Sequence, residues 1–474
     1  MLDSERHGLL DEACGICAYI SSGAPHHGML TRVLDGLESL QHRGQEASGV
    51  VRKNALNIID CIKSSGLVRE LKQRVQQEWG EQGECADHVL AHTRYRTSGV
   101  ADLSAAQPLV LHTRFGTLAL AHNGHIVNAE ALFAELEQLE YFEHELPRVD
   151  SALLLYLIHY TQGDDFHEVL SACLNRLGGA FSMVLFSEHF GEFALRDAHG
   201  VRPLVYGQDV AHQGWVIASE SVALESFHVT GFKEVPVGSW VRFVRGEQPQ
   251  TTVWNRDENR SAQRCLFELV YFSHQSSTVF DRQVEQVRKA MGRELYRERP
   301  ISDVDMVLAV PFSSCPAAVG YAQAARLPYI EAIVRRQDHR RSFIEPTQEE
   351  RRDVVRQKFQ VHGELVRGKR VVVIDDSLVR GTTAHGVVRL LKEAGCHDVH
   401  LRIASPAVVS PCYYGIDTPD IEDLAAARAD LMQLQQSIGV ASLAYLSLEG
   451  LYRAVQGHDF CDACFTGQYN LPTS

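Results

Sequence analysis

Two neighbouring acids at the end of a short apolar stretch are the residues whose types and spacing most clearly suit chemistry. Asp375 and Asp376 directly follow residues 371–374, which are Val, Val, Val and Ile. A short β-branched run of this kind predicts a buried parallel strand with the acids at its carboxyl end. Paired carboxylates can accept hydrogen bonds from two neighbouring sugar hydroxyls, or bind a hydrated Mg²⁺ together with substrate oxygens.

The residues that follow the acids suit an anion, and they are Ser377, Arg380, Gly381, Thr382 and Thr383. Gly381 lets the backbone approach a ligand closely, and the N–H groups that begin an expected helix at 384–394 add positive potential. A strand that ends in Asp before a Gly turn is by itself weak evidence, because many α/β proteins contain one. Over residues 370–383, however, the stretch resembles the 5-phosphoribosyl-1-pyrophosphate (PRPP) signature of type I phosphoribosyltransferases. The resemblance implies that the acids contact the ribose hydroxyls and that the Thr loop holds the 5′-phosphate.

The composition indicates a folded enzyme of more than one domain. The chain has 474 residues, of which 45% are hydrophobic and 22% charged. Its formal net charge of −14 argues against a nucleic acid or an anionic membrane as partner. Residues 1–13 are polar and lack the pattern of a signal peptide, and no apolar stretch is long enough to cross a bilayer, so we expect a cytoplasmic protein. Eleven cysteines in such a chain favour metal-binding, catalytic or buried thiols over disulfides.

A second candidate site lies near the N-terminus, where Cys14 opens an apolar, strand-like segment. A lone cysteine there would most often be a small core residue. Three further segments change that interpretation, at residues 41–49, 91–99 and 118–128. Together with Cys14 they resemble the class II, N-terminal-nucleophile glutamine amidotransferases, and the order and spacing match over roughly residues 14–240.

This resemblance implies that residues 1–13 are a leader that is removed, so that the freed α-amino group of Cys14 becomes the base for its own thiol. The thiolate would attack the side-chain amide of glutamine. The Asn123 amide and the Gly124 N–H would stabilise the oxyanion, although an Asn-Gly pair is more often a hairpin turn.

The resemblance also assigns two residues to the ends of glutamine. Arg94 would hold the α-carboxylate, because its planar fork matches a carboxylate. Asp150 would hold the α-ammonium. An ion pair for Arg94 and a helix cap for Asp150 remain alternatives. His125 stands where close relatives usually carry Asn, which adds a titratable group beside the oxyanion hole.

The chain is thus expected to form two domains after the leader 1–13. Residues 14–250 are expected to be a class II glutamine amidotransferase domain, an α+β protein whose four-layer αββα sandwich is implied by the resemblance. Residues 248–264 are polar and uneven and are the best linker candidate. Residues 265–474 alternate strands and helices, which predicts an α/β type I phosphoribosyltransferase domain around a doubly wound parallel sheet, ending in a cluster-binding segment.

Two further loops of the second domain are expected to contact PRPP. Ser313, in the loop 311–314, fits the pyrophosphate-binding place, with an ordinary strand-to-helix turn as the alternative. The basic segment 335–344 corresponds to the loop that closes over PRPP in the family, and its Arg335 and Arg341 are candidates for contacts with the phosphates. The loop differs from the family pattern at the residues Gln337, Asp338 and Arg340, and the segment 273–277 differs as well. These departures leave open how ammonia release is coupled to its use, or which acceptor takes it.

Four cysteines form the last candidate site, namely Cys265, Cys412, Cys461 and Cys464. Four thiolates suit either a tetrahedral Zn²⁺ or a [4Fe–4S] cluster, so the ligand type does not choose between them. The resemblance to the iron–sulfur subclass of amidophosphoribosyltransferases implies the cluster, with a structural role. Zinc and unligated thiols are the alternatives.

Taken together, the two halves resemble the amidophosphoribosyltransferases over nearly the whole chain after the leader. The resemblance implies glutamine and PRPP as substrates, 5-phosphoribosylamine as the product of the first step of purine synthesis, and Mg²⁺ as cofactor. It also implies an interior path for ammonia, purine nucleotides as feedback inhibitors, and a homotetramer. Two alternatives stay open: a paralogue with the same sites but another pathway, and a PRPP-sensing regulator without chemistry.

Overall fold

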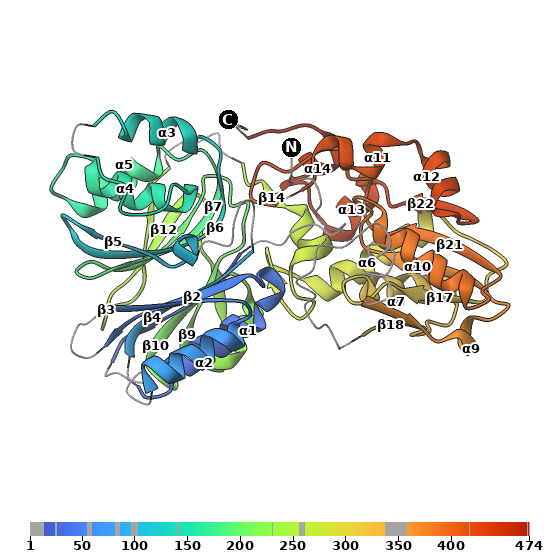
Figure 1. The fold of residues 1–474 in the computed structure, drawn as a ribbon, viewed down its shortest axis with the longest axis horizontal. Helices are drawn as coiled ribbons and strands as arrows, with labels where there is room; N and C mark the ends of the chain where they lie inside the picture. Colours follow the sequence, from blue (N-terminus) through green and yellow to red (C-terminus); the bar gives the residue numbers. More distant parts are fainter. Residues whose placement is uncertain are drawn as a thin grey trace.

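The computed structural model of the chain consists of two lobes that lie side by side (Figure 1). The residues that it describes are 14–23, 26–54, 59–80, 86–95, 103–139, 142–229, 231–255, 261–336, 358–416, 418–471 and 473. No helix among them is long and apolar enough to cross a membrane. The expected leader, residues 1–13, lies outside the described residues.

The first lobe is a sandwich of two antiparallel sheets. The seven-stranded sheet runs in the order β11 (Phe232–Glu234), β9 (Val205–Asp209), β10 (Gly214–Ala218), β1 (Gly15–Ser21), β4 (Ala86–Arg94), β2 (Ala47–Asn54) and β3 (Ile59–Ser65). The six-stranded sheet runs in the order β13 (Gln250–Val253), β12 (Ser239–Phe243), β8 (Gly191–Arg196), β7 (Gly179–Ser187), β6 (Gly116–Ile126) and β5 (Leu109–Thr113).

Helices cover the outer faces of both sheets, which completes the expected αββα sandwich (Figure 1). They are α1 (Met29–Ser39) and α2 (Val68–Glu78) on the first sheet, and α3 (Ala129–Leu136), α4 (Leu153–Tyr160) and α5 (Phe166–Leu174) on the second. All seven residues of β1 are buried, because alternate side chains point to opposite faces and both faces are covered. Ile16, Ala18 and Ile20 pack between the sheets, whereas Cys17 and Tyr19 pack under the helices. Cys14 is thus attached to one of the best-packed strands of the lobe.

The second lobe is built on a parallel sheet, as expected. Its order is β17 (Met306–Ala309), β20 (Arg370–Asp375), β21 (Asp398–Ile403) and β22 (Ser442–Tyr445). The helices that cover its two faces are α6 (Val284–Glu298), α7 (Cys315–Ala325) and α13 (Leu448–Val455) on one, and α10 (Thr382–Glu393) and α12 (Leu431–Ile438) on the other. In β20, Val371 and Val373 face one helical layer, while Val372 and Ile374 face the other. This burial on both faces explains the unbroken apolar run seen in the sequence.

Shorter elements complete the described chain. They are β14 (Arg264–Cys265), β15 (Thr278–Val279), β16 (Arg282–Gln283), β18 (Ile333–Arg335), β19 (Phe359–Val361), β23 (Phe460–Cys461), α9 (Gly363–Val366), α11 (Ala425–Arg428), α14 (Ala463–Thr466), a π-helical turn Glu268–Phe272, and 3₁₀ turns at Gln41–Arg43, Leu103–Ala105, Asp150–Ala152, Ser221–Phe227 and Ile421–Asp423. Cys265 in β14 pairs with Cys461 in β23, so the two ends of the second lobe lie together.

Three local features differ from the expectations from sequence. The expected linker 248–264 includes β13, which pairs with β12, and Trp254, which packs in the core of the first lobe. The helix expected at 384–394 begins earlier, at Thr382, directly after Gly381. The pair Asn123-Gly124 is not a hairpin turn but lies inside the long strand β6.

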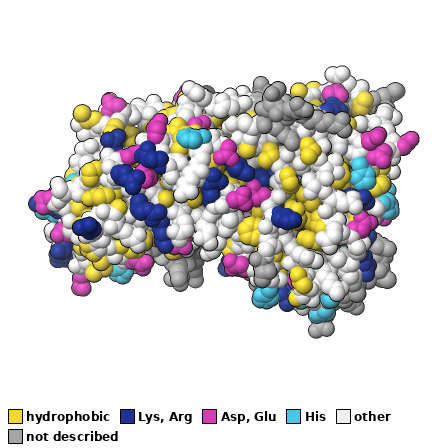
Figure 2. Space-filling model, turned by 180° about the vertical axis from the view of Figure 1, so that it is seen from behind, with side chains coloured by type: hydrophobic (Ala, Val, Ile, Leu, Met, Phe, Trp, Pro, Cys, Tyr) yellow, Lys and Arg dark blue, Asp and Glu magenta, His cyan; other side chains and the backbone are white. Residues whose placement is uncertain are grey.

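On the described part of the face in Figure 2, Lys and Arg side chains gather over the half that belongs to the second lobe, among acidic and uncharged side chains.

Candidate functional site

The first site lies where the central strands of the sandwich end at the second lobe. Cys14 immediately precedes β1, and the register between β1 and β4 places Gly15 opposite Thr93, so Arg94 lies beside Cys14. Burial raises the pKa of the Cys14 thiol, and the nearby charge of Arg94 opposes this effect. A thiol whose neutral form is favoured needs a base before it can act as a nucleophile.

A buried amide without a partner among the described residues lies in β6 of the other sheet, the strand whose Ile126 donates to Asp150, and the charge of Asp150 acts on Cys14. Asn123 in β6 is fully buried, and neither its side-chain nitrogen nor its side-chain oxygen has a hydrogen-bond partner among the described residues. Leaving a buried amide unpaired costs free energy, and such groups in folded proteins usually have a ligand or another specific cause. Asn123 is therefore suited to receive a hydrogen-bonding group of a ligand.

Asp150 opens the 3₁₀ turn Asp150–Ala152 beside the end of the same strand, and its Oδ1 accepts from the hydroxyl of Ser151 at 3.3 Å. Its Oδ2 accepts from the backbone N–H of Ile126 at 3.1 Å and lies 3.4 Å from His125 Nδ1. Burial opposes its ionisation, but these partners outweigh burial and lower the pKa of Asp150 to about 2. The hydrogen bond to Asp150 in turn raises the pKa of His125. Asp150 is thus a carboxylate at neutral pH, available to a cationic group.

The second site lies at the carboxyl end of β20, as the sequence predicted. Asp375 is the last residue of the strand, and the backbone N–H of Asp376 donates to its Oδ1 at 3.0 Å. Asp376 accepts hydrogen bonds from the hydroxyls of Ser313 and Ser377. Burial raises the pKa of both acids, and the charge of Asp376 raises that of Asp375 further. The pair therefore favours a cation or hydroxyl donors beside it.

The loop after the acids leads into a helix of twelve residues, α10. Gly381 precedes it with a φ of +83°, a conformation that glycine adopts without strain, and Thr382 and Thr383 form its first turn. The N–H groups at the N-terminus of a helix attract anions. Arg380 Nη2 lies 3.9 Å from Asp423 Oδ2, so Arg380 also has an acidic partner outside this turn.

The structure describes one of the two arginines expected near the phosphates. Arg335 ends β18, and its guanidinium carbon lies 5.8 Å from the ring centre of Phe312, in the loop 311–314. Arg335 thus reaches the loop that carries Ser313. Arg341 and the departures at residues 337, 338 and 340 lie outside the described residues.

The four candidate ligand cysteines line one cavity, Cys265, Cys412, Cys461 and Cys464. Arg202 and Tyr414 line it as well. Burial raises the pKa of Cys265 to about 12 and also raises the pKa values of Cys461 and Cys464. Among the described residues, no group of three or more His, Cys, Asp or Glu side chains lies close enough together to hold a single metal ion.

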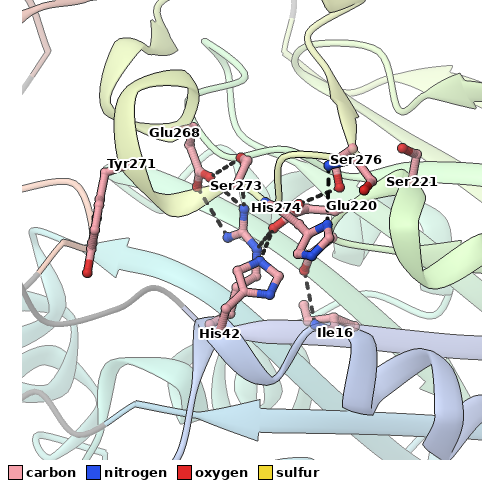
Figure 3. Close-up of polar contacts among 12 residues, drawn as sticks. Ile16, His42, Glu220, Ser221, Glu268, Tyr271, Ser273, His274 and Ser276 are labelled. Carbon is pink, nitrogen blue, oxygen red and sulfur yellow. Dashed lines mark hydrogen bonds and ion pairs between the residues drawn. The ribbon is translucent and has the colours of Figure 1, made fainter. Parts of the chain in front are cut away.

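Sequence reasoning missed a buried charge network that joins the two lobes (Figure 3). The guanidinium of Arg43 contacts Glu220 of the first lobe and lies 2.5 Å from Glu268 Oε2 of the second. Arg202 Nη1 lies 3.1 Å from the other oxygen of Glu268. None of these four side chains is exposed. Arg43 and Arg202 did stand in segments matched to the amidotransferases, but nothing in the sequence pointed to Glu268 as their partner.

The segment 273–277, which departs from the family pattern, is held by this network (Figure 3). Glu220 accepts from the backbone N–H of His274 at 2.8 Å and from the Ser277 hydroxyl at 2.6 Å. The Ser273 hydroxyl donates to Glu268 at 2.8 Å. Arg288 of α6 donates to the carbonyl of Ser273 at 2.8 Å, and the charge of Asp376 acts on its guanidinium. The segment 273–277 therefore contacts the interlobe ion pairs on one side. On the other side it contacts Arg288, on which the charge of Asp376 acts.

Comparisons with known proteins give the same division of the chain. A family model described as a glutamine amidotransferase domain matches residues 92–226, and one described as a phosphoribosyl transferase domain matches residues 282–408. The chain is 38% identical to an amidophosphoribosyltransferase of Synechocystis, covering 97% of this chain and 91% of the relative. It is 35% identical to that of Methanocaldococcus jannaschii, covering 92% and 94%.

Solved structures agree over the full length. The glutamine PRPP amidotransferase of B. subtilis, complexed with ADP and GMP, matches with a TM-score of 0.87 at 33% identity, covering 97% of this chain and 98% of that one. A structure described as the allosteric regulatory enzyme of purine biosynthesis matches with a TM-score of 0.88, also at 33% identity, covering 97% of each chain.

The interlobe network yields a prediction about stability. Glu268→Gln leaves Arg43 and Arg202 buried with too little negative charge, so we expect the free energy of unfolding to fall by about 3–5 kcal/mol. Denaturant titration measures the change. Glu285→Gln is the matched control, since it removes only the partly exposed partner of Lys289 and should cost about 1 kcal/mol or less. Equal losses in the two variants would contradict the importance assigned to the network.

The pair of His125 and Asp150 yields a prediction about pH. Asp150 stabilises the protonated imidazole, so Asp150→Asn should lower the pKa of His125 back towards its ordinary value. The measurement is an NMR titration of the His125 ring. Glu137→Gln serves as control because it removes the acid next to a different histidine, His144. An unchanged His125 titration in Asp150→Asn would show that the two side chains do not interact.

Proposed function

The chain belongs to the amidophosphoribosyltransferase family, and we propose that Cys14 and the pair Asp375 and Asp376 carry the two halves of its reaction. Glutamine, water and PRPP give glutamate, pyrophosphate and 5-phosphoribosylamine, in the first step of purine biosynthesis. The observation that supports the assignment of residues is that one chain carries both the buried Asn123 amide, without a partner among the described residues, and an acid pair beside the glycine-led first turn of α10.

In the first half, the Cys14 thiolate attacks the side-chain amide carbon of glutamine. The α-amino group of Cys14, freed by removal of residues 1–13, takes the thiol proton, which the raised pKa of the thiol makes necessary. Asn123 and Gly124 donate to the oxyanion. Arg94 holds the α-carboxylate, and the ionised Asp150 holds the α-ammonium. Ammonia leaves, and water then hydrolyses the thioester to glutamate.

In the second half, ammonia attacks C1 of PRPP and pyrophosphate departs. The 5′-phosphate sits on the first turn of α10, against Gly381, Thr382 and Thr383. Ser313 lies in the loop 311–314, where the pyrophosphate is expected to bind, and Arg335 contacts Phe312 of the same loop.

Mg²⁺ fits the acid pair. Two buried acids whose pKa values are both raised gain from a neighbouring divalent cation, and Asp375 and Asp376 offer the oxygen ligands that Mg²⁺ prefers. When bound together with the pyrophosphate, Mg²⁺ supplies neutralisation of negative charge on the leaving group.

We also infer that Cys265, Cys412, Cys461 and Cys464 hold a [4Fe–4S] cluster. All four line one cavity, and burial keeps at least three of these thiols neutral unless a cationic centre is present. Arg202 lines the same cavity, and its Nη2 has no hydrogen-bond partner among the described residues. A buried guanidinium nitrogen without an acceptor suits the negative charge of a thiolate-ligated cluster, where hydrogen bonds to sulfur are common.

Purine nucleotides are proposed as regulators, because the related B. subtilis structure is complexed with ADP and GMP. A homotetramer remains a prediction from the resemblance, and a cytoplasmic location remains a prediction from the sequence pattern.

The assignment of Cys14 is tested by separating the two nitrogen donors. Pyrophosphate release from PRPP and Mg²⁺ is measured with glutamine or with ammonium on anaerobically purified protein. Cys14→Ala should abolish glutamine-dependent release, because the nucleophile is gone, and should spare ammonium-dependent release. Cys61→Ala, which changes an exposed cysteine, should leave both activities unchanged. Equal loss of both activities in Cys14→Ala would overturn the division into two sites.

The cluster is tested without reference to activity. Anaerobically purified protein should contain about four iron and four sulfide per chain and show thiolate-to-iron absorption. Cys412→Ser should lose most of both, whereas Cys315→Ser, in the same lobe but outside the cavity, should retain them. If the protein instead contains stoichiometric zinc and no sulfide, the four cysteines form a zinc site and not a cluster site.

A further inference from the structure

The backbone of Gly124 is held between two other backbones, one from each lobe. On the side of the first lobe, a Cβ added to Gly124 would lie 2.1 Å from the carbonyl oxygen of Ala180. On the other side lies Gly415 of the second lobe. A Cβ added there would lie 2.6 Å from the carbonyl carbon of Gly124 and 2.7 Å from its Cα. No side chain fits in either gap, so the two glycine backbones are in direct contact.

The loop that carries Gly415 is itself fixed. The carbonyl of Tyr414 accepts from Arg202 Nε at 3.0 Å, and the Tyr414 hydroxyl donates to the carbonyl of Leu471 at 2.8 Å. The backbone N–H of Cys412 donates to the Thr418 hydroxyl at 2.5 Å. Tyr414 is buried. The loop 412–416 therefore meets Gly124 as an anchored surface.

Gly124 needs such support from outside. Its φ of +144° is a conformation that residues with side chains rarely adopt, and it has no side chain whose packing could fix the peptide. The direction of its N–H is therefore set by the backbones around it, namely β7, whose Phe181 pairs with Gly124, and the loop of Gly415 on the other side. A Cβ on Gly124 would meet Ala180 and Phe181, and a Cβ on Gly415 would meet the Gly124 backbone itself.

We propose that Gly415 is a positioning residue for the glutamine reaction: the loop 412–416 of the second lobe fixes Gly124 so that its N–H points at the oxyanion. This inference rests on the proposed function, in which Gly124 is an oxyanion donor. It means that the phosphoribosyltransferase lobe completes the glutaminase site. It also means that Cys412, an expected cluster ligand, belongs to the loop that holds the oxyanion hole in shape.

The test is Gly415→Ala, assayed with both nitrogen donors. The added methyl group displaces the Gly124 peptide without removing its N–H, so kcat with glutamine should fall about 10- to 100-fold, at or below the lower end of the range seen when one oxyanion donor is removed altogether. The KM for glutamine should stay within about twofold, because the contacts with its α-groups are untouched. Ammonium-dependent activity should not change. Gly246→Ala is the matched control, because Gly246 has a similar φ of +80° but no atom within 4 Å of an added Cβ.

A second readout addresses the oxyanion directly. The Cys14 thiolate adds to the carbonyl carbon of the γ-aldehyde analogue of glutamine. The former carbonyl oxygen then becomes the oxyanion. In Gly415→Ala its inhibition constant should rise by about the same factor by which kcat/KM falls. A loss of stability alone would not produce this correlation.

Three outcomes would overturn the inference. Gly415→Ala could match Gly246→Ala in kcat with glutamine, could lose both nitrogen-donor activities equally, or could keep full affinity for the aldehyde. If Gly415→Ala does not fold, Tyr414→Phe decides by the same criteria, since it frees the loop from Leu471 without filling space. Absence of glutamine-dependent activity in the unmodified protein would instead contradict the proposed function.

Discussion

Glu268 is a buried carboxylate from the second lobe that sits between two buried guanidinium groups from the first, those of Arg43 and Arg202. Charges removed from water must be paired, so the close packing of the lobes at this point depends on the match between Glu268 and the two arginines. Other residues near the two candidate sites are linked to these ion pairs by hydrogen bonds. Glu220, which also pairs with Arg43, holds the segment 273–277, and its neighbour Ser219 accepts a hydrogen bond from Ile16, two residues after Cys14. Buried ion pairs therefore contribute to the relative position of the two sites, together with apolar and backbone contacts between the lobes.

The two sites use aspartate in opposite ways, and the cause is the local environment. Asp150 is partly buried, but a histidine and a backbone N–H compensate its charge, which keeps it ionised and ready for a cation. Asp375 is buried beside another acid, so its charged form is disfavoured until a cation or sugar hydroxyls arrive. The first aspartate is thus prepared for a cationic group, whereas the acid pair needs a cation or hydroxyl donors beside it.

Much of the second site could be predicted from the sequence, because the residues that specify it are close together in the chain. The run 371–374 and the acids after it specify a buried strand and its functional end within a few residues. The helix start at Thr382 was missed by two residues because the signal was the left-handed Gly381, which an apolar pattern does not reveal. The partners of Arg43 and Gly124 could not be predicted at all. Arg43 and Glu268 are 225 positions apart, and the contact between Gly124 and Gly415 involves no side chain whose chemistry could announce it.

The pairing of β14 with β23 has a consequence for the order of folding during synthesis. Residues 264–265 begin the second lobe, yet their partner strand is Phe460–Cys461, close to the end of the chain. The first lobe has all its strands once Val253 has been translated and can fold while the ribosome is still at work. The second lobe cannot close until nearly the last residues have emerged. A nascent chain would thus carry a folded sandwich whose Gly124 still lacks the loop that fixes it, so glutamine hydrolysis without a receiving site is disfavoured until the chain is complete.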